Sequence, residues 1–320
     1  MRIDMQALKS LVLESGLDLV FVTHGIQRAL LAAYEKNHPD VEARVVFNTK
    51  TGDASVLVKN PETGEEIDDT PVDFARVATQ SARRVIETAL QDAKEGYFID
   101  EFRAKKGKII SGIILQSEDE DNIKLDIGYG KYEAILPLAE RIPGEIYMHG
   151  TRIRVYVLDV FRGNKGPIIH VSRSHPGLVE ALFEQEVPEM QDKKVEIVNV
   201  SREAGHRSKI AVKSNDKSVN AIGATIGPVG SRVRNVMNEL GGEKIDIIEY
   251  SDDPAQFVKN ALSPAKASKV EILSKLQKEA RAWVPEYQLS LAIGAVGQNA
   301  RLAARLTGWK IDILADEKGE

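Results

Sequence analysis

A repeated pattern of glycines near the C-terminus constrains the fold of this chain more than any other feature. The segment IGPVGSRVRNVMNELGGEKIDI begins at Ile226 and IGAVGQNARLAARLTGWKIDI begins at Ile293, so Gly227 and Gly294 lie 67 residues apart. Each copy reads as an apolar helix, a GxxG turn, an amphipathic helix and a KIDI strand. A period of this length indicates two copies of one domain of about 70 residues.

The context of each GxxG turn points to nucleic acid. Glycine marks many turns, but a GxxG between two helices and before a strand is typical of a KH domain, whose loop clamps a nucleic-acid backbone. Gly227, Gly230, Gly294 and Gly297 lack the Cβ that would block a phosphate, and the next helix directs its positive end at that charge. The alternative is a pair of helical hairpins in which glycine only permits tight packing.

Polar and basic side chains follow both loops. Arg232 and Arg234 follow the first loop, and Asn299, Arg301 and Arg305 follow the second. Arg301 and Arg305 are spaced as i and i+4, which places them on one helix face. We therefore predict that these five residues contact RNA.

Charge is distributed unevenly along the chain. The formal net charge is −5, from 43 Lys and Arg against 48 Asp and Glu, which argues weakly against a nucleic-acid partner. By region, residues 1–190 carry −8 and residues 191–320 carry +3. Basic residues are densest over 202–234, where Arg207 and Lys209 are further candidate RNA contacts. A solvated charged face is the alternative.

Residues 107–173 have the pattern of a small β-barrel. Five short β-branched runs, separated by Gly, Pro and acidic turns, favour an OB-type Greek-key barrel, a fold that often binds oligonucleotides. Tyr129 and Tyr132 flank a glycine turn where a base could stack, and Arg173 could contact a phosphate at the end of the last strand. The alternative is a barrel that only packs, with both tyrosines in its wall.

The N-terminal region reads as helices and a hairpin. Apolar spacing predicts helices over 4–15 and 25–36, and alternation about a Thr-Gly-Asp turn predicts a hairpin over 41–58. The polar stretch 61–71 reads as a loop. A long helix is predicted over 72–94, N-capped by Thr70 with Pro71 as its first residue. A docking module fits this region better than an active site.

Several kinds of chemistry are excluded by absent residues and motifs. The chain has no cysteine, which excludes a disulfide scaffold, a zinc ribbon and a thiol nucleophile, and fits a reducing cytoplasm. It contains no GxxxxGK[ST], HExxH or GxSxG motif. No apolar run is long enough for a membrane span, and the first residues lack the apolar stretch of a signal peptide. We expect no catalysis, cofactor, metal or membrane partner.

The motifs resemble the NusA family of bacterial transcription elongation and termination factors, with an actinobacterial character. The similarity lies in SREAGHRSKIAVKSN, IGPVGSRVRNVMNEL, GEKIDIIEY, NALSPAK, YQLSLAIG and GQNARLAARLTGWKIDI, and extends more loosely over almost the whole chain. The resemblance implies a multidomain α+β protein: a helical and hairpin N-terminal domain (1–106), an S1-type OB barrel (107–174) and two tandem type II KH domains (175–251 and 252–320).

The resemblance also implies partners. Residues 1–106 would bind RNA polymerase, and the barrel and KH domains would hold single-stranded nascent RNA, modulating pausing, termination and antitermination. Other Nus-type transcription factors are candidate partners, and we expect a cytoplasmic monomer. The alternatives are a ribosome-associated RNA-binding protein and an RNA-processing protein, although the phosphorolytic exonucleases place KH and S1 domains after a catalytic core.

Two segments depart from the family pattern. The family's second loop usually carries a lysine where this chain has Ala295, followed by Val296, and the first loop carries Pro228 and Val229. We therefore expect weaker phosphate attraction at these uncharged loops. Residues 268–284 show nearly helical spacing, whereas the family implies two strands. We expect strands imposed by tertiary contacts, with a turn near 274–278.

Overall fold

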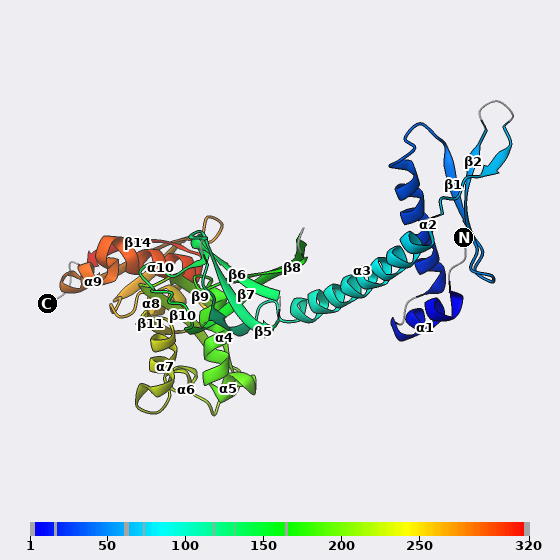
Figure 1. Ribbon diagram of the computed structural model, residues 1–320. Coiled ribbons are helices and arrows are strands. Elements are labelled where there is room, and N and C mark those ends of the chain that lie inside the picture. Colours follow the sequence, from blue (N-terminus) through cyan, green and yellow to red (C-terminus); the bar gives the residue numbers. More distant parts are fainter. Residues whose placement is uncertain are drawn as a thin grey trace. The chain divides into compact units, whose positions relative to one another are not determined.

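The computed structural model describes residues 4–15, 18–60, 64–72, 74–117, 119–130, 132–163 and 166–316. The chain divides into two compact units, residues 1–100 and 101–320. Figure 1 shows the first unit from blue to cyan and the second from cyan to red. Among the described residues, no helix combines the length and apolar character needed to cross a membrane.

The first unit packs helices against a small sheet. Helices α1 (Met5–Ser15) and α2 (Leu19–Glu35) precede strands β1 (Ala43–Phe47), β2 (Ala54–Lys59) and β3 (Glu66–Asp68), which form an antiparallel sheet in the order β1-β2-β3. Helix α3 (Phe74–Arg103) then leads into the second unit. Ile26 and Leu30, one turn apart on α2, are fully buried against the sheet and α3.

The predicted helices and hairpin are present here, with three corrections. Helix α2 begins six residues before the predicted start, because the Asp18 carboxylate caps it by accepting from Val20 N–H at 2.7 Å. The predicted loop 61–71 contains strand β3. Thr70 does not cap α3: its hydroxyl instead accepts from Val56 N–H at 2.9 Å, and α3 runs from Phe74 to Arg103 rather than over 72–94.

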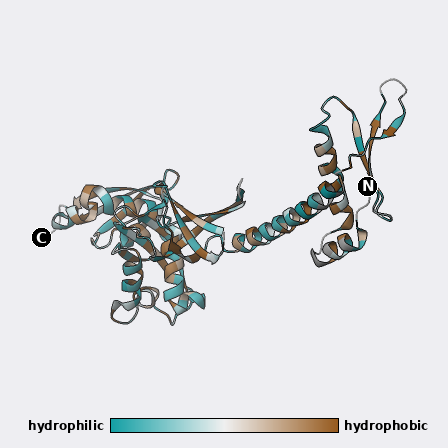
Figure 2. Ribbon diagram, viewed as in Figure 1, coloured by the Kyte–Doolittle hydropathy of each residue, from teal (hydrophilic) through white to brown (hydrophobic). Residues whose placement is uncertain are grey.

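The five strands predicted for residues 107–173 form a closed barrel. They are β4 (Ile109–Ile114), β5 (Asn122–Tyr129), β6 (Tyr132–Pro137), β7 (Arg152–Gly163) and β8 (Gly166–Ser172). The strand order is β4-β5-β6-β8-β7, with β6 and β8 parallel and the other pairs antiparallel. Buried aliphatic side chains alternate along the strands, as a barrel interior requires. Figure 2 shows brown, apolar stretches along the barrel strands.

Two domains of one topology follow the barrel. The first contains α4 (Pro176–Glu186), α5 (Pro188–Gln191), β9 (Val195–Glu203), β10 (Arg207–Ser214), α6 (Ala221–Ile226), the 3-10 turn η2 (Pro228–Gly230), α7 (Ser231–Glu239) and β11 (Lys244–Glu249). The second contains α8 (Pro254–Ala261), β12 (Lys269–Ser274), β13 (Glu279–Pro285), η3 (Glu286–Gln288), α9 (Leu289–Ile293), η4 (Ala295–Gly297), α10 (Gln298–Thr307) and β14 (Lys310–Asp316).

Both domains carry a mixed three-stranded sheet. The middle strand pairs antiparallel with the strand before it and parallel with the strand after the helices, in the orders β11-β10-β9 and β12-β13-β14. The duplicated αββααβ order is that of type II KH domains. The expected strands over 268–284 are therefore confirmed. Ala280, Ala282 and Val284 alternate into the core of the second domain, which overrides the helical propensity of this stretch.

Candidate nucleic-acid interface

The two GxxG loops adopt the same backbone conformation. Gly227 and Gly294 have φ and ψ near 76° and 170–174°, a region open to glycine only, and Gly230 and Gly297 are left-handed at φ 73°. In each loop the N–H of the second glycine donates to the carbonyl of the first, at 3.0 Å and 3.1 Å. The four glycines predicted from the repeat thus build two matching turns.

Each loop presents one exposed valine in a strained conformation. Val229 and Val296 have φ of 51° and 50°, and 90% and 92% of their surface is exposed. A left-handed β-branched residue is a true outlier, and such strain concentrates at ligand-binding sites. The loop tips are therefore open, apolar and held in one shape.

The N-terminus of a helix directly follows each GxxG loop. Gly230 and Gly297 are the N-caps of α7 and α10, and glycine has no side chain with which to cap the first-turn N–H groups. Those N–H groups and the helix dipole favour an anion such as a phosphate. Ala295 and Val296 in the second loop and Pro228 and Val229 in the first contribute no charged side chain, and Pro228 has no N–H to donate.

Matching arginines brace the two loops. Arg234 donates to the Val229 carbonyl at 2.5 Å, and Arg301, at the equivalent position of the second repeat, donates to the Val296 carbonyl. Both guanidinium groups therefore lie beside the loop tips, as the sequence predicts. Their hydrogen bonds also help to hold each valine in its left-handed conformation.

Arg232 and Asn299, which are equivalent in the repeat, are turned inward. Arg232 donates to the Glu189 carboxylate at 2.8 Å and to the Ala224 carbonyl at 2.6 Å. Asn299 is buried and donates to the carbonyls of Leu262 and Ala292 at 3.0 Å and 2.9 Å. The prediction that these side chains face RNA therefore needs correction: they fix each loop to the helices beneath it.

Arg301 and Arg305 share a carboxylate from the first KH domain. Glu203, at the end of β9, accepts from Gln298 at 2.8 Å, from Arg301 Nε at 3.2 Å and from Arg305 at 3.0 Å. Burial alone would raise the pKa of Glu203, but the hydrogen bonds from Gln298 and Arg301 outweigh it and hold the pKa below its ordinary value. The two predicted arginines do lie on one face, with an acidic neighbour.

Arg207 and Lys209 are part of a largely buried ion network. Both donate to Asp246 of β11, from Arg207 Nη2 at 2.7 Å and from Lys209 Nζ at 2.9 Å, and Lys209 also donates to the Ser263 carbonyl at 2.5 Å. The Lys209 side chain is 0% exposed, so it cannot reach a phosphate. Burial lowers the pKa of Lys209, although Asp246 opposes that shift. The predicted contact through Lys209 is corrected to a structural link between the KH domains.

Arg173 is also buried and joins the barrel to the first KH domain. Its guanidinium contacts the Glu145 carboxylate, the Arg154 carbonyl at 2.8 Å and Glu239 Oε1 at 3.1 Å. These contacts use the donors that would otherwise bind a phosphate, and the side chain is only 2% exposed. The predicted phosphate contact at Arg173 is therefore corrected as well.

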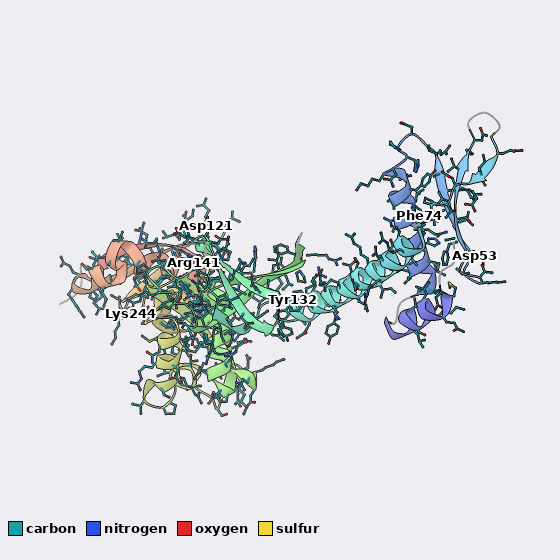
Figure 3. The ribbon with its side chains drawn as sticks, viewed as in Figure 1. Asp53, Phe74, Asp121, Tyr132, Arg141 and Lys244 are labelled. Carbon is teal, nitrogen blue, oxygen red and sulfur yellow. The ribbon has the colours of Figure 1, made fainter. Side chains whose placement is uncertain are left out.

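The two barrel tyrosines lie opposite one another. Tyr129 and Tyr132 are paired across β5 and β6, and Tyr132 begins β6 (Figure 3). The Tyr129 ring packs edge-on against Phe102 at 4.9 Å, and its hydroxyl donates to Glu101 at 2.5 Å and accepts from Lys105 at 2.9 Å. Tyr129 keeps 38% of its surface exposed, enough for partial stacking by a base.

Sequence reasoning missed the residues that join the domains. Arg202 and Glu243 form a fully buried ion pair at 2.8 Å, and Arg202 also donates to the carbonyls of Arg173 and His175 at 2.9 Å. Glu203 likewise connects the first KH domain to Gln298, Arg301 and Arg305 of the second. The repeat pattern carries no signal for these contacts, because their partners lie far away along the chain.

The fold and the paired loops define the class of protein to which this chain belongs. Proteins of this class have an OB-type barrel followed by tandem KH domains, here with two matching GxxG turns. The NusA-like first KH domain matches residues 173–250, and the NusA-like second KH domain matches residues 254–320. These two matches together span the region that contains both loops.

Relatives extend the similarity to the whole chain. Three proteins named transcription termination/antitermination protein NusA are similar to it. That of Mycobacterium tuberculosis is 48% identical, covering 99% of this chain and 94% of the relative. That of Bacillus subtilis is 42% identical (98% and 90% covered), and that of Thermus thermophilus 37% (96% and 88%). The chain belongs to the NusA family, and the mycobacterial relative agrees with its actinobacterial character.

Proposed function

We propose that this chain is an RNA-binding transcription factor that holds nascent single-stranded RNA on bacterial RNA polymerase and modulates pausing, termination and antitermination. The observation that carries the proposal is the pair of matching GxxG turns, each with an exposed tip in front of an uncapped helix N-terminus. The names of the relatives support the transcriptional role.

The RNA contacts we propose are a subset of those predicted from the sequence. They are the loop glycines Gly227, Gly230, Gly294 and Gly297, the arginines Arg234, Arg301 and Arg305 beside them, and Tyr129 and Tyr132 on the barrel. Arg207 makes only a minor RNA contact, because Asp246 binds its guanidinium and only 24% of its side chain is exposed. Buried contacts of Arg173 join the barrel to the first KH domain, and those of Lys209 join the first KH domain to the second. They support one composite surface, which gains affinity through effective concentration.

The division of labour follows the domain order. We propose that residues 1–106 dock on RNA polymerase, that residues 107–174 form the barrel, and that residues 175–251 and 252–320 form the KH domains. Docking of residues 1–106 on the polymerase would raise the local concentration of nascent RNA at the barrel and the KH domains. We further propose a cytoplasmic monomer without catalysis, cofactor or metal, and other Nus-type factors as additional partners.

Transcription kinetics test this proposal. On a template with a hairpin-dependent pause, the full chain should change the pause lifetime and the termination efficiency of purified bacterial RNA polymerase. The variant Val229→Asp/Val296→Asp should lose most of that effect, because each carboxylate repels the RNA backbone at a loop tip. Aspartate tolerates the left-handed region better than valine, so both loops keep their shape.

The matched control is Leu276→Asp, which adds a carboxylate at a site 95% exposed, between β12 and β13 and away from either loop. It should behave as the wild-type chain. An unchanged pause lifetime with the wild-type chain, or equal activity of the double variant and the wild-type chain, would contradict the proposal. Retention of the chain on ribosomes but not on RNA polymerase would favour the ribosome-associated alternative.

A further inference from the structure

The helix after the second GxxG loop receives a carboxylate from the first KH domain. Glu203 belongs to β9 of the first KH domain, yet its three side-chain donors, Gln298, Arg301 and Arg305, all lie on α10 of the second. The equivalent arginine of the first domain, Arg234, forms no ion pair with the part of the chain that the structure describes. Its guanidinium donates to the loop carbonyl of Val229.

The Glu203 carboxylate occupies the groups that a phosphate would use. Arg301 reaches the Val296 carbonyl with one terminal nitrogen and Glu203 with Nε, and Arg305 reaches the same carboxylate oxygen. The arginine side chains are 46% and 52% exposed, whereas that of Glu203 is 18% exposed. An RNA phosphate therefore has access to the guanidinium groups, but must compete with the carboxylate for them.

The carboxylate is held in place by the fold rather than by these arginines alone. Four residues earlier on the same strand, Asn199 of β9 donates to the Leu306 carbonyl of α10 at 2.9 Å. Lys209 links the same two domains through Ser263. Removing the charge of Glu203 therefore leaves the contact between β9 and α10 in place.

We propose that Glu203 sets the RNA affinity of the second KH domain by competing with RNA phosphates for Arg301 and Arg305. Exposed ion pairs of this kind are weak, whereas an arginine can grip a phosphate through two hydrogen bonds, so RNA can displace the carboxylate. This competition lowers the affinity of the second KH domain for RNA. It also prevents up to two guanidinium–phosphate contacts from contributing fully to binding. This inference rests on the proposed RNA-binding function.

The test is the salt dependence of RNA binding by the full-length variant Glu203→Gln. The neutral amide keeps a hydrogen-bonding partner for Gln298 but releases both guanidinium groups. Binding to an unstructured single-stranded RNA should tighten about tenfold at low salt. The slope of log K against log salt should steepen by about 0.7 for each phosphate gained, about 1.4 for two.

Glu271→Gln is the matched control. Like Glu203→Gln it removes one negative charge, in this case from β12 of the second KH domain, where Glu271 pairs at 3.4 Å with the exposed Lys269 of the same strand. Its salt slope should equal that of the wild-type chain. A change shared by both variants would contradict the inference, because it would reflect net charge and not the release of two arginines.

Two other results separate the possible failures. If the wild-type chain binds RNA and Glu203→Gln leaves the slope unchanged or weakens binding, Glu203 is a structural or supporting residue and the inference fails alone. If the wild-type chain does not bind RNA, the proposed function is wrong, and the inference about Glu203 is then wrong as well. Hydrogen exchange of α10 amides, unchanged in Glu203→Gln, confirms that the domain contact is intact.

Discussion

The two KH domains have one loop geometry in two different settings. In the first, Arg232 is paired with Glu189, Arg234 donates to the loop carbonyl, and the KIDI aspartate, Asp246, is enclosed by two cations. In the second, the equivalent of Arg232 is a buried amide, Asn299, and the arginines share Glu203. Its KIDI aspartate, Asp312, lies at the surface with Arg281.

The repeated glycines determine the geometry of each turn, whereas neighbouring elements determine which charged side chains remain available to a ligand. Glycines and a helix start are local properties, so they are the same in both copies. Burial and ion pairing depend on what packs against each copy: the barrel and the second KH domain for the first copy, and the first KH domain for the second.

The largest expected difference is between the two KIDI aspartates. Asp246→Asn leaves Lys209 buried without its carboxylate, so the first KH domain should lose about 3 kcal/mol. Asp312→Asn removes an exposed pair 3.0 Å from Arg281 and should cost less than about 1 kcal/mol. Hydrogen exchange of β10 and β13 amides reports each domain separately. Equal costs would show that the buried network contributes nothing.

The first glycine of each loop should also respond unequally. An alanine at either position incurs the strain of positive φ, about 2 kcal/mol. At Gly294 the new Cβ would lie 2.7 Å from the backbone nitrogen of Asn299, which cannot move freely, whereas at Gly227 it meets the Arg232 side chain. We expect Gly294→Ala to destabilise its domain by about 1 kcal/mol more than Gly227→Ala. Local exchange of α10 and α7 measures this, and a reversed order would contradict the packing difference.

Acid should weaken the first KH domain through Asp246. Burial opposes its ionisation, but the hydrogen bond from Arg207 and the charge of Lys209 hold its pKa below the ordinary value. The folded state therefore binds fewer protons than the unfolded state, and stability is lost as pH falls below about 4. Urea unfolding between pH 6 and roughly 3 should show a smaller loss in Asp246→Asn than in the wild-type chain. Parallel losses would assign acid sensitivity to other groups.

The smallest expected effect comes from restoring a base to the second loop. Ala295→Lys places an ammonium beside the loop tip, so RNA binding should tighten a few-fold at low salt and the salt slope should steepen by about 0.7. Pro228→Lys is the counterpart in the first loop and also restores an N–H donor. Superimposable titrations of Ala295→Lys and the wild-type chain at two salt concentrations would rule out a phosphate at this loop.

Local patterns predicted much of this molecule. The 67-residue spacing from Gly227 to Gly294 predicted two domains with matching loops, and period-two runs predicted all five barrel strands. Residues 268–284 needed more than periodicity, because Ala280 and Ala282 form a strand through contacts with β14 and the core. The family resemblance supplied that expectation where propensity pointed to a helix.

Local sequence patterns did not predict which charged side chains are buried in the fold. In the sequence, Lys209 has the character of a basic surface residue. In the fold it is buried, and its ammonium donates to Asp246, 37 positions later, and to the Ser263 carbonyl. Arg173 likewise meets Glu239 from another domain, 66 positions away. Burial of this kind is a property of tertiary packing, so a count of charges along the chain overstates the basic surface.

Direct RNA binding by the full chain tests the central claim, that both GxxG tips contact the RNA backbone. For Val229→Asp/Val296→Asp, we expect a loss of affinity for unstructured single-stranded RNA of about 100-fold, with intermediate losses for each single variant and none for Leu276→Asp. Wild-type affinity in the double variant would show that the GxxG tips do not contact the RNA backbone.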